Sequence, residues 1–411
     1  MSLPDPSIHC ENQPENQKTL QHLSTPHQQT ILTIALLIAL YAMLAMFDNF
    51  KGIFVPYFKQ DFAISNAQVG VLMTSSLLAY AVFQYICGML VERFGHKRVV
   101  SSGIVVAILA LLLIVNARSF PLLLLGFFAL NIGSATFNVA VNTLGPMVQV
   151  ASTATLMNII NFSYGTSNTI SQKAVGQLLA RGVRWPSFFV FLIAAAALLF
   201  IFLLLIRLPQ YHQEHKVIYS KKDLFKNKFL YLYIVAIGFY LAAEYGTGNW
   251  FVNYMSDTYQ LGADLRSTYV ALFFGLETVG RLFGGVVIDR LGYYRSILVC
   301  GLGAFALTLA GILMGRSGLL IFALAGLGYS IIYPTIMLAF YHVFKEAAVY
   351  ATGLLLMSGT LLAMLVNLII GIANDYLGSR LAFYAIALCL AIFLAAVWQI
   401  WQSSRKTHTS I

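Results

Sequence analysis

The chain reads Gly88-Met-Leu-Val-Glu92-Arg93-Phe-Gly95-His-Lys97-Arg98 between two long apolar runs, and it repeats this pattern at Gly285-Val-Val-Ile-Asp289-Arg290-Leu-Gly292-Tyr-Tyr-Arg295. In both stretches a glycine is followed by an acid–arginine pair, a second glycine and a basic residue. A membrane protein made of two similar halves has the organisation of an alternating-access transporter. The alternative is that two unrelated basic turns connect membrane helices.

The composition indicates that lipid surrounds most of the chain. Hydrophobic residues make up 59% and charged residues only 10%, whereas soluble domains carry about 25% charged residues. A membrane-spanning helix needs roughly 20 apolar residues. The apolar runs therefore predict an all-α membrane protein with twelve transmembrane helices in two six-helix halves. The runs centre near Leu40, Ala79, Ala107, Phe128, Gly165, Ala196, Gly238, Glu277, Ala306, Gly328, Leu361 and Leu390.

The connections between these runs are short, which leaves no room for a soluble catalytic domain. We expect a cytoplasmic tail over residues 1–27, a first half over 28–207, a cytoplasmic linker over 208–228, a second half over 229–403 and a tail over 404–411. The first tail is rich in Gln, Pro, Asn and His. It lacks the apolar centre of a signal peptide, so we expect it to be disordered.

The basic residues favour one orientation in a cell membrane. With both termini in the cytoplasm, more than half of the 25 Lys and Arg residues lie on the cytoplasmic side, as the positive-inside rule requires. The net charge of +10 then reflects topology and contact with anionic lipid. Nucleic-acid binding is not expected, because the basic residues are scattered over separate loops. We expect a monomer.

The sequence predicts no metal site, no cofactor and no enzymatic activity. The four cysteines form no C-x-x-C pair, the eight histidines form no H-x-x-x-H pair, and the chain has no G-x-x-x-x-G-K phosphate loop. Without a site for ATP, a gradient has to drive any transport.

Five charged residues lie well inside the apolar runs: Asp48, Lys173, Glu244, Glu277 and Arg281. Each would cost roughly 2.5–3.5 kcal/mol at the centre of a bilayer. We therefore expect these side chains to face the bundle interior, a water-filled cavity or one another. Glu277 and Arg281 are four residues apart and share one helix face, so they are candidates for a structural or gating ion pair.

Glu244 is the first candidate for proton coupling. It has no cation within four residues, and a buried carboxyl group of this kind can bind and release protons. The alternative is that Glu244 pairs with a residue on another helix. Asp48 is the second candidate, which is weaker because Lys51 three residues on can hold it ionised.

Two predicted helices carry stripes of polar, mainly amide, side chains. One stripe contains Asn131, Ser134, Asn138 and Asn142, and the other contains Asn158, Asn161, Asn168 and Gln172, with Lys173 beside it. At the helical period the members of each stripe lie on one side of their helix. Two facing stripes form a neutral wall that suits sugar hydroxyls, which both donate and accept hydrogen bonds. The alternative is that the amides bond helices together.

Three further polar residues are candidates for the cavity. Tyr329 and Tyr333 lie beside Pro334 in the tenth span, where the missing N–H of proline predicts a kink. Asn249 lies in the seventh span, in the segment that follows Glu244.

The two charged stretches resemble the signature loop of the major facilitator superfamily, which joins helices 2 and 3 and recurs between helices 8 and 9. The resemblance covers about residues 28–403 and implies the twelve-helix fold. It also implies a cytoplasmic gate that is held by charge-assisted bonds between helices. The gating candidates are Gly88, Glu92, Arg93, Gly95, Arg98, Glu277, Arg281, Gly285, Asp289, Arg290, Gly292 and Arg295.

The segments around Glu244 and Gly280-Arg281 also resemble the fucose–proton symporters and related bacterial glucose transporters. That resemblance implies proton-linked movement of a sugar. Two positions depart from the family pattern. The family has an acid four residues before the first-helix proline, where this chain has Gly52, and an acid four residues before Asn142, where this chain has Asn138.

We therefore expect a secondary transporter that moves a small polar solute, with a sugar preferred, together with protons across the cell membrane. One alternative is an exporter of drugs or organic anions, and Lys173 would suit an anion. A second alternative is a membrane sensor that binds its ligand without transporting it.

Overall fold

The protein is helical in the residues that the computed structural model describes, which are 26–64, 66–208 and 221–408. The first six helices are α1 (Pro26–Phe62), α2 (Asn66–Phe94), α3 (His96–Val115), α4 (Phe120–Leu144), α5 (Thr153–Ala180) and α6 (Pro186–Leu205). The helices that follow are α7 (Lys221–Lys226), α8 (Lys228–Tyr259), α9 (Ala263–Leu291), α10 (Tyr293–Leu313), α11 (Leu319–Tyr329), α12 (Ile332–Phe344), α13 (Ala348–Leu377), α14 (Ser379–Ala382) and α15 (Tyr384–His408).

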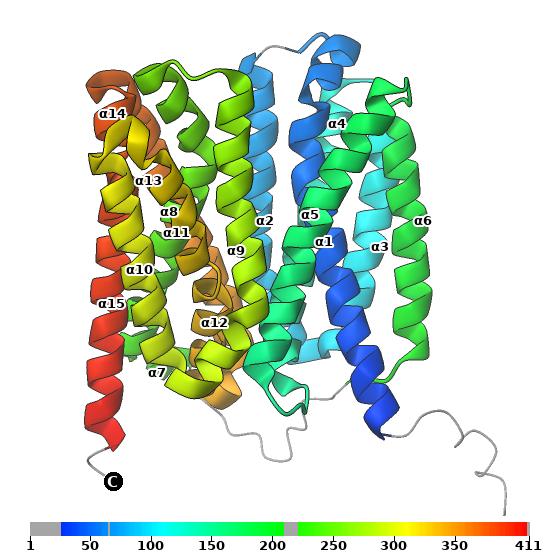
Figure 1. The fold of residues 1–411 in the computed structure, drawn as a ribbon. Helices are drawn as coiled ribbons and strands as arrows, with labels where there is room; N and C mark the ends of the chain where they lie inside the picture. Colours follow the sequence, from blue (N-terminus) through cyan, green and yellow to red (C-terminus); the bar gives the residue numbers. More distant parts are fainter. Residues whose placement is uncertain (1–25, 65, 209–220, 409–411) are drawn as a thin grey trace, which may run out of the picture.

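These helices make twelve crossings of one bundle (Figure 1), because α11 continues into α12 and α14 continues into α15. Eleven of the crossings are long and apolar enough to span a membrane. The twelfth is α5, which has 28 residues but carries one of the polar stripes. The twelve predicted centres fall one in each crossing, so the predicted fold class is confirmed.

The buried hydrophobic side chains form two large clusters. One cluster is built mainly from α1–α6 and the other mainly from α8–α15, and the two sets of helices stand beside each other in Figure 1. The short helix α7 was not predicted, and it lies within the expected linker. The boundaries of the two halves stay predictions.

The connections α2–α3 and α9–α10 contain the two charged stretches, and they lie at the same end of the bundle as the start of α1 and the end of α15 (Figure 1). This end is called the hinge end below. Gly95 and Gly292 each stand directly between two helices, with φ of +80° and +77°. A residue with a side chain is strained in this left-handed region, so glycine lets each stretch turn within one residue.

The first glycine of each stretch lies where helices of different halves cross. A Cβ atom on Gly88 of α2 would lie 2.9 Å from the Cα atom of Gly353 in α13, and one on Gly285 of α9 would collide with Thr155 of α5. The repeated sequence therefore has the same structural role twice. It forms a sharp turn, and it allows a close crossing to the other half.

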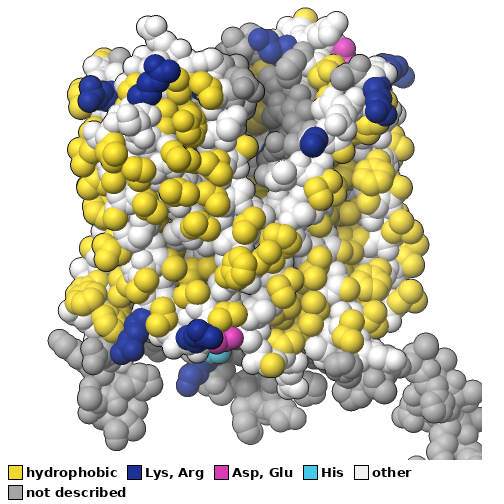
Figure 2. Space-filling view, viewed as in Figure 1, with side chains coloured by type: hydrophobic (Ala, Val, Ile, Leu, Met, Phe, Trp, Pro, Cys, Tyr) yellow, Lys and Arg dark blue, Asp and Glu magenta, His cyan; other side chains and the backbone are white. Residues whose placement is uncertain are grey.

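The surface agrees with a protein that crosses a membrane. Figure 2 shows hydrophobic side chains over the middle of one face, with Lys and Arg gathered towards the two ends. The same view shows a hollow between the two groups of helices at the end opposite the hinge end. The bundle is therefore closely packed at the hinge end and open at the opposite end.

Candidate transport site

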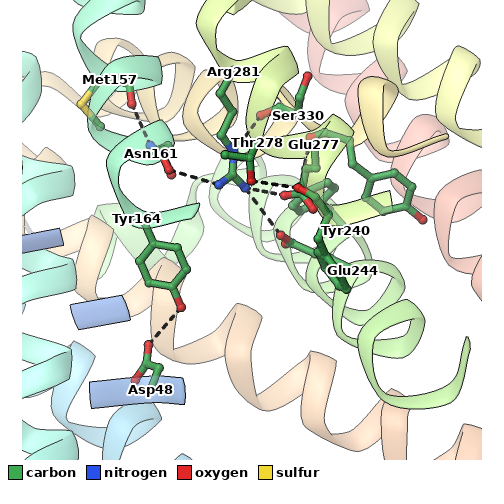
Figure 3. A network of polar contacts seen from close by, with 12 residues as sticks. Asp48, Met157, Asn161, Tyr164, Tyr240, Glu244, Glu277, Thr278, Arg281 and Ser330 are labelled. Carbon is green, nitrogen blue, oxygen red and sulfur yellow. Dashed lines mark hydrogen bonds and ion pairs between the residues drawn. The ribbon is translucent and has the colours of Figure 1, made fainter. Parts of the chain in front are cut away.

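Arg281 is the centre of a buried polar cluster between the two halves (Figure 3). Its Nη2 atom donates a hydrogen bond to Oε1 of Glu277, one turn earlier on α9. The same Nη2 atom lies 3.8 Å from Oε1 of Glu244 on α8. Glu277 and Arg281 are buried, whereas the side chain of Glu244 is 16% exposed. One guanidinium group thus interacts with two carboxylate groups.

The break between α11 and α12 gives Arg281 another partner. Its Nε atom donates to the main-chain oxygen of Ser330 at 3.3 Å. Pro334 explains why this carbonyl is free, because proline has no N–H to bond the residue four positions earlier. The kink predicted from Pro334 is confirmed, and the break supplies an acceptor for the guanidinium group.

The last contact of Arg281 crosses to the first half. Its Nη1 atom donates to the main-chain oxygen of Asn161 in α5 at 3.2 Å. The amide group of Asn161 itself donates to the main-chain oxygen of Met157 at 2.8 Å. Because a main-chain oxygen receives the bond, the link between the halves depends on Arg281 and not on the side chain of Asn161.

Glu244 has no cation within four residues in the sequence, and the alternative of a cationic partner on another helix is confirmed. The cation is Arg281 on α9, next to α8 in the bundle but distant in the sequence. The predicted pairing of Glu277 with Arg281 is confirmed. The sequence identified all three charged groups, and the packing of α8 against α9 brings them together.

Asp48 and Lys51 bond to different partners. Oδ2 of Asp48 accepts a hydrogen bond from the hydroxyl group of Tyr164 on α5 at 3.3 Å. Nζ of Lys51 donates to Oδ1 of Asn131 on α4 at 3.1 Å. Within the described residues, the ion pairs up to 4.0 Å are those of Arg281. A direct ion pair with Lys51 therefore does not hold Asp48.

The amides of α4 belong to an uncharged hydrogen-bonded chain, called the amide–tyrosine chain below. Thr360 Oγ1 donates to Gln84 Oε1 (3.1 Å), Gln84 Nε2 to Asn138 Oδ1 (3.4 Å), Asn138 Nδ2 to Tyr41 OH (3.3 Å), and Asn142 Nδ2 to the hydroxyl groups of Tyr41 (2.9 Å) and Tyr333 (3.3 Å). The chain begins and ends in the second half and passes through the first half. It therefore joins the halves without using charge.

Sequence reasoning missed several members of these networks. Gln84 is an isolated amide in an apolar run, so the sequence alone could have identified it as a candidate. Tyr41, Tyr164 and Thr360 carry no comparable pattern. Tyrosine and threonine are common in membrane helices, and only the packing shows which of their hydroxyl groups meet a polar partner.

The two polar stripes do not form one wall. Helix α1 packs against both α4 and α5, which have no comparable contact with each other. The hydroxyl group of Tyr41 on α1 accepts hydrogen bonds from the α4 amides. Asp48, also on α1, accepts a hydrogen bond from Tyr164 of α5. The prediction of facing stripes is wrong, because α4 and α5, which are consecutive in the sequence, each pack against α1 and not against each other.

The remaining cavity candidates lie in different surroundings. Tyr329 is fully buried in the core of the second half, which does not support a place in the cavity wall. Asn249 is exposed and donates to Oδ1 of Asn367 at 3.5 Å. Asn168 is half-buried, and Lys173 is exposed on α5. The side chain of Gln172 lies outside the described part of the structure.

Five of the six charged gating candidates at the hinge end do not form the expected bridges between helices in the described part of the chain. Arg93, Arg98, Asp289, Arg290 and Arg295 are exposed, and none of them forms an ion pair within 4.0 Å in the described part of the chain. Glu92 is half-buried and has interacting neighbours.

Uncharged contacts hold the halves together at this end. They are the two glycine crossings and a hydrogen bond of 2.7 Å between the hydroxyl groups of Tyr85 and Tyr350.

Known proteins share this architecture over nearly the whole chain. The glucose/galactose transporter of Brucella abortus is 25% identical, with 90% of this chain and 94% of that protein covered. The probable nitrate transporter NarT of Staphylococcus carnosus is also 25% identical, with 86% and 91% covered. The crystal structure of the transporter FucP in the outward conformation superimposes with a TM-score of 0.78, at 19% identity, over 90% of this chain and 98% of that one.

The family comparison agrees with the geometry. The sequence profile of the Major Facilitator Superfamily matches residues 36–350, and again residues 250–410. Together these matches cover the twelve crossings and both charged stretches. The chain is therefore a multi-pass membrane protein that belongs to the Major Facilitator Superfamily.

Proposed function

We propose that this protein is a proton-coupled secondary transporter of a sugar in the cell membrane, and that it acts as a monomer without catalytic activity. The observation that carries the proposal is the sharing of Arg281 by Glu244 and Glu277. Beside it, the amide–tyrosine chain offers uncharged donors and acceptors. We assign the hinge end and both termini to the cytoplasm, as the distribution of basic residues favours.

The charged cluster is suited to binding one proton. With both carboxyl groups ionised, two negative charges share one positive charge, and a net charge of −1 remains in a buried site. Buried charge without compensation is costly. A single proton on either carboxyl group makes the cluster neutral. Glu244 is the group through which protons enter, because it is the more exposed of the two.

The uncharged network supports a sugar as the solute. Amide and hydroxyl groups can both donate to and accept from the hydroxyl groups of a sugar. Asn138, Asn142 and Tyr333 bring such groups from both halves to one place. The likeness to a glucose/galactose transporter agrees with a hexose, which has no charge to be neutralised.

The alternative of an anionic solute rests on the likeness to a probable nitrate transporter and on Lys173. The charges inside the bundle oppose it. Asp48, Glu244 and Glu277 outnumber Lys51 and Arg281, and Arg281 is already held by two carboxylates. Lys173 is exposed. An anion would therefore meet an excess of negative charge at the middle of the membrane.

The proposed state is open to the outside. The close crossings at Gly88 and Gly285 pack the hinge end, and the hollow in Figure 2 lies at the opposite end. The FucP structure used for comparison is itself in the outward conformation. In this state Glu244 is reachable by protons from the outer side.

The direct test is uptake by proteoliposomes that contain the purified protein. Labelled glucose, galactose, fucose, nitrate and a small organic acid are compared with and without an inward proton gradient. We expect a neutral sugar to accumulate only when the gradient is present. Accumulation of nitrate or the organic acid in place of a sugar would reject the proposed substrate class, and binding without transport of any solute would favour a sensor.

A further inference from the structure

Helices α5 and α9 belong to different halves and pack closely over the part of the bundle near the hinge end. Gly285 lies against Thr155, Gly284 against Asn158, and Gly165 against Thr278. Along α5 the contacts follow one another at residues 155, 158 and 165, and along α9 they run in the opposite direction at residues 285, 284 and 278. They form a line of contacts, called the α5–α9 seam below, and glycine at one side of each pair permits the close approach.

Arg281 lies within this seam. Its bond to the main-chain oxygen of Asn161 falls between the Asn158 and Gly165 contacts. Among the described contacts of the α5–α9 seam, the bond from Arg281 to Asn161 is the one that involves a charged group. The other contacts are uncharged side chains packed against glycine, so a change in proton concentration acts on the seam through Arg281.

Three acceptors other than Asn161 fix the direction of the guanidinium group. Glu277 and Glu244 bind Nη2, and the carbonyl group freed by Pro334 binds Nε. A planar guanidinium group holds its five N–H donors in fixed relative directions. Orientation by these three acceptors therefore points Nη1 at the oxygen of Asn161.

We propose that Arg281 is the residue that couples proton binding to separation of the two halves. The inference rests on the proposed proton-coupled function and adds the connection between its proton site and the movement. A proton from the outer side binds a carboxylate oxygen of Glu244, and the charge of the cluster changes from −1 to zero. Glu244 then no longer attracts the guanidinium group, the bond to Asn161 weakens, and the α5–α9 seam can open at the hinge end.

The same turn of α5 carries the contact to the second acid. Tyr164, three residues after Asn161, donates to Asp48 of α1 (Figure 3). A displacement of this turn that follows release of Arg281 therefore also reaches Asp48. The charged cluster of the second half and the acid of the first half are connected through one segment of helix.

The other ionisable groups around Arg281 do not offer a competing explanation at ordinary pH. Around Arg281 they are the tyrosines Tyr41 on α1, Tyr164 on α5 and Tyr240 on α8. Around Glu244 they are Tyr245 on α8 and Tyr329 and Tyr333 on the broken crossing. Tyrosine is neutral at physiological pH. Among the described residues, the acids and bases facing this part of the seam are Glu244, Glu277 and Arg281. Asp48 lies on α1 and bonds to Tyr164, one turn further along α5, and Lys51 of α1 bonds to Asn131.

The test measures the distance between the hinge ends of α5 and α9 as a function of pH. Spin labels are placed at the exposed positions Ala151 and Leu291, after replacement of Cys10, Cys87, Cys300 and Cys389 by alanine. In lipid nanodiscs without solute, we expect a short distance at alkaline pH and a growing population with a long distance at acidic pH.

Two variants separate coupling from packing. Arg281→Lys keeps the charge but loses the planar set of donors, so the ratio of long to short distances should rise by roughly tenfold or more at alkaline pH and lose its pH dependence. Glu244→Gln imitates the protonated acid and should show, at every pH, the long-distance population that the unmodified protein shows at acidic pH. Thr278→Val is the matched control in the same seam, because its hydroxyl group bonds only within α9 in the described contacts, and it should keep the pH dependence.

Retention of the normal pH dependence in Arg281→Lys would overturn the inference, as would a Glu244→Gln protein that behaves like the unmodified protein at alkaline pH. These outcomes are distinct from failure of the proposed function. If no sugar is taken up but the distance still depends on pH and on Arg281, the substrate is wrong and the coupling role stands. If sugar uptake needs protons but Arg281→Lys moves normally, the coupling role is wrong and the function stands.

Discussion

The two halves bring different chemistry to the middle of the bundle. The second half contributes Glu244, Glu277 and Arg281, a cluster whose charge changes when one proton binds. The first half contributes Asn138 and Asn142, whose amides stay neutral and bond to tyrosine hydroxyl groups. Hinge sequences of one pattern thus support halves with separate roles. The repeat fixes the turn and the crossing, and single residues within the helices decide what each half does.

The largest expected effect is on stability, from removal of the cation in the charged half. Arg281→Met leaves Glu277 buried without its partner, and breaking a buried ion pair in this way costs about 3–5 kcal/mol. We expect a clear fall in the thermal unfolding temperature in detergent. The control is the combined variant Arg281→Met with Glu244→Gln and Glu277→Gln, which removes the unpaired charge. Equal loss in the single and the combined variants would show that the charge imbalance does not matter.

The next effect is on energy coupling. Glu244→Gln keeps the size of the side chain but fixes it in the neutral form. We expect accumulation of solute against its gradient to be lost, while exchange of labelled for unlabelled solute continues. Asp48→Asn is the comparison, because its amide oxygen can still accept the bond from Tyr164, and we expect it to keep accumulation. If Asp48→Asn loses accumulation and Glu244→Gln keeps it, the two acids have the reverse roles.

A smaller effect is expected in the amide–tyrosine chain. Tyr41→Phe removes the hydroxyl group that accepts from both Asn138 and Asn142. A buried donor left without a partner costs about 1–3 kcal/mol. We expect weaker sugar binding by isothermal titration, with a pH dependence of uptake that is unchanged. A change in the pH dependence would mean that the neutral chain also takes part in proton coupling.

The smallest effect is expected at Lys173. Its side chain is exposed on α5, and surface substitutions usually change free energies by at most about 0.5 kcal/mol. Lys173→Ala should therefore change the KM for sugar uptake by no more than about twofold. A much larger rise in KM would place Lys173 on the path of the solute and would revive the anionic alternative.

The sequence predicted the crossings but not which of them touch. Hydrophobic runs and two repeated turns are local features, so twelve helices and two halves can be read without the structure. The amide stripes of α4 and α5 were identified correctly as polar, and their facing arrangement was not, because α1 packs against both helices. The hinge charges were assigned to a gate, whereas the contacts between the halves that are described at this end include two glycine crossings and a tyrosine pair.

The sequence by itself determined the membrane fold, the sharp turns at Gly95 and Gly292, and the presence of charged groups where lipid should exclude them. The tertiary structure alone decided that Glu244 shares a cation with Glu277, and that this cation also reaches α5. The physical reason is distance along the chain. A pattern of spacing describes one helix at a time, whereas an ion pair between helices depends on which faces pack together, and that choice is made by the whole bundle.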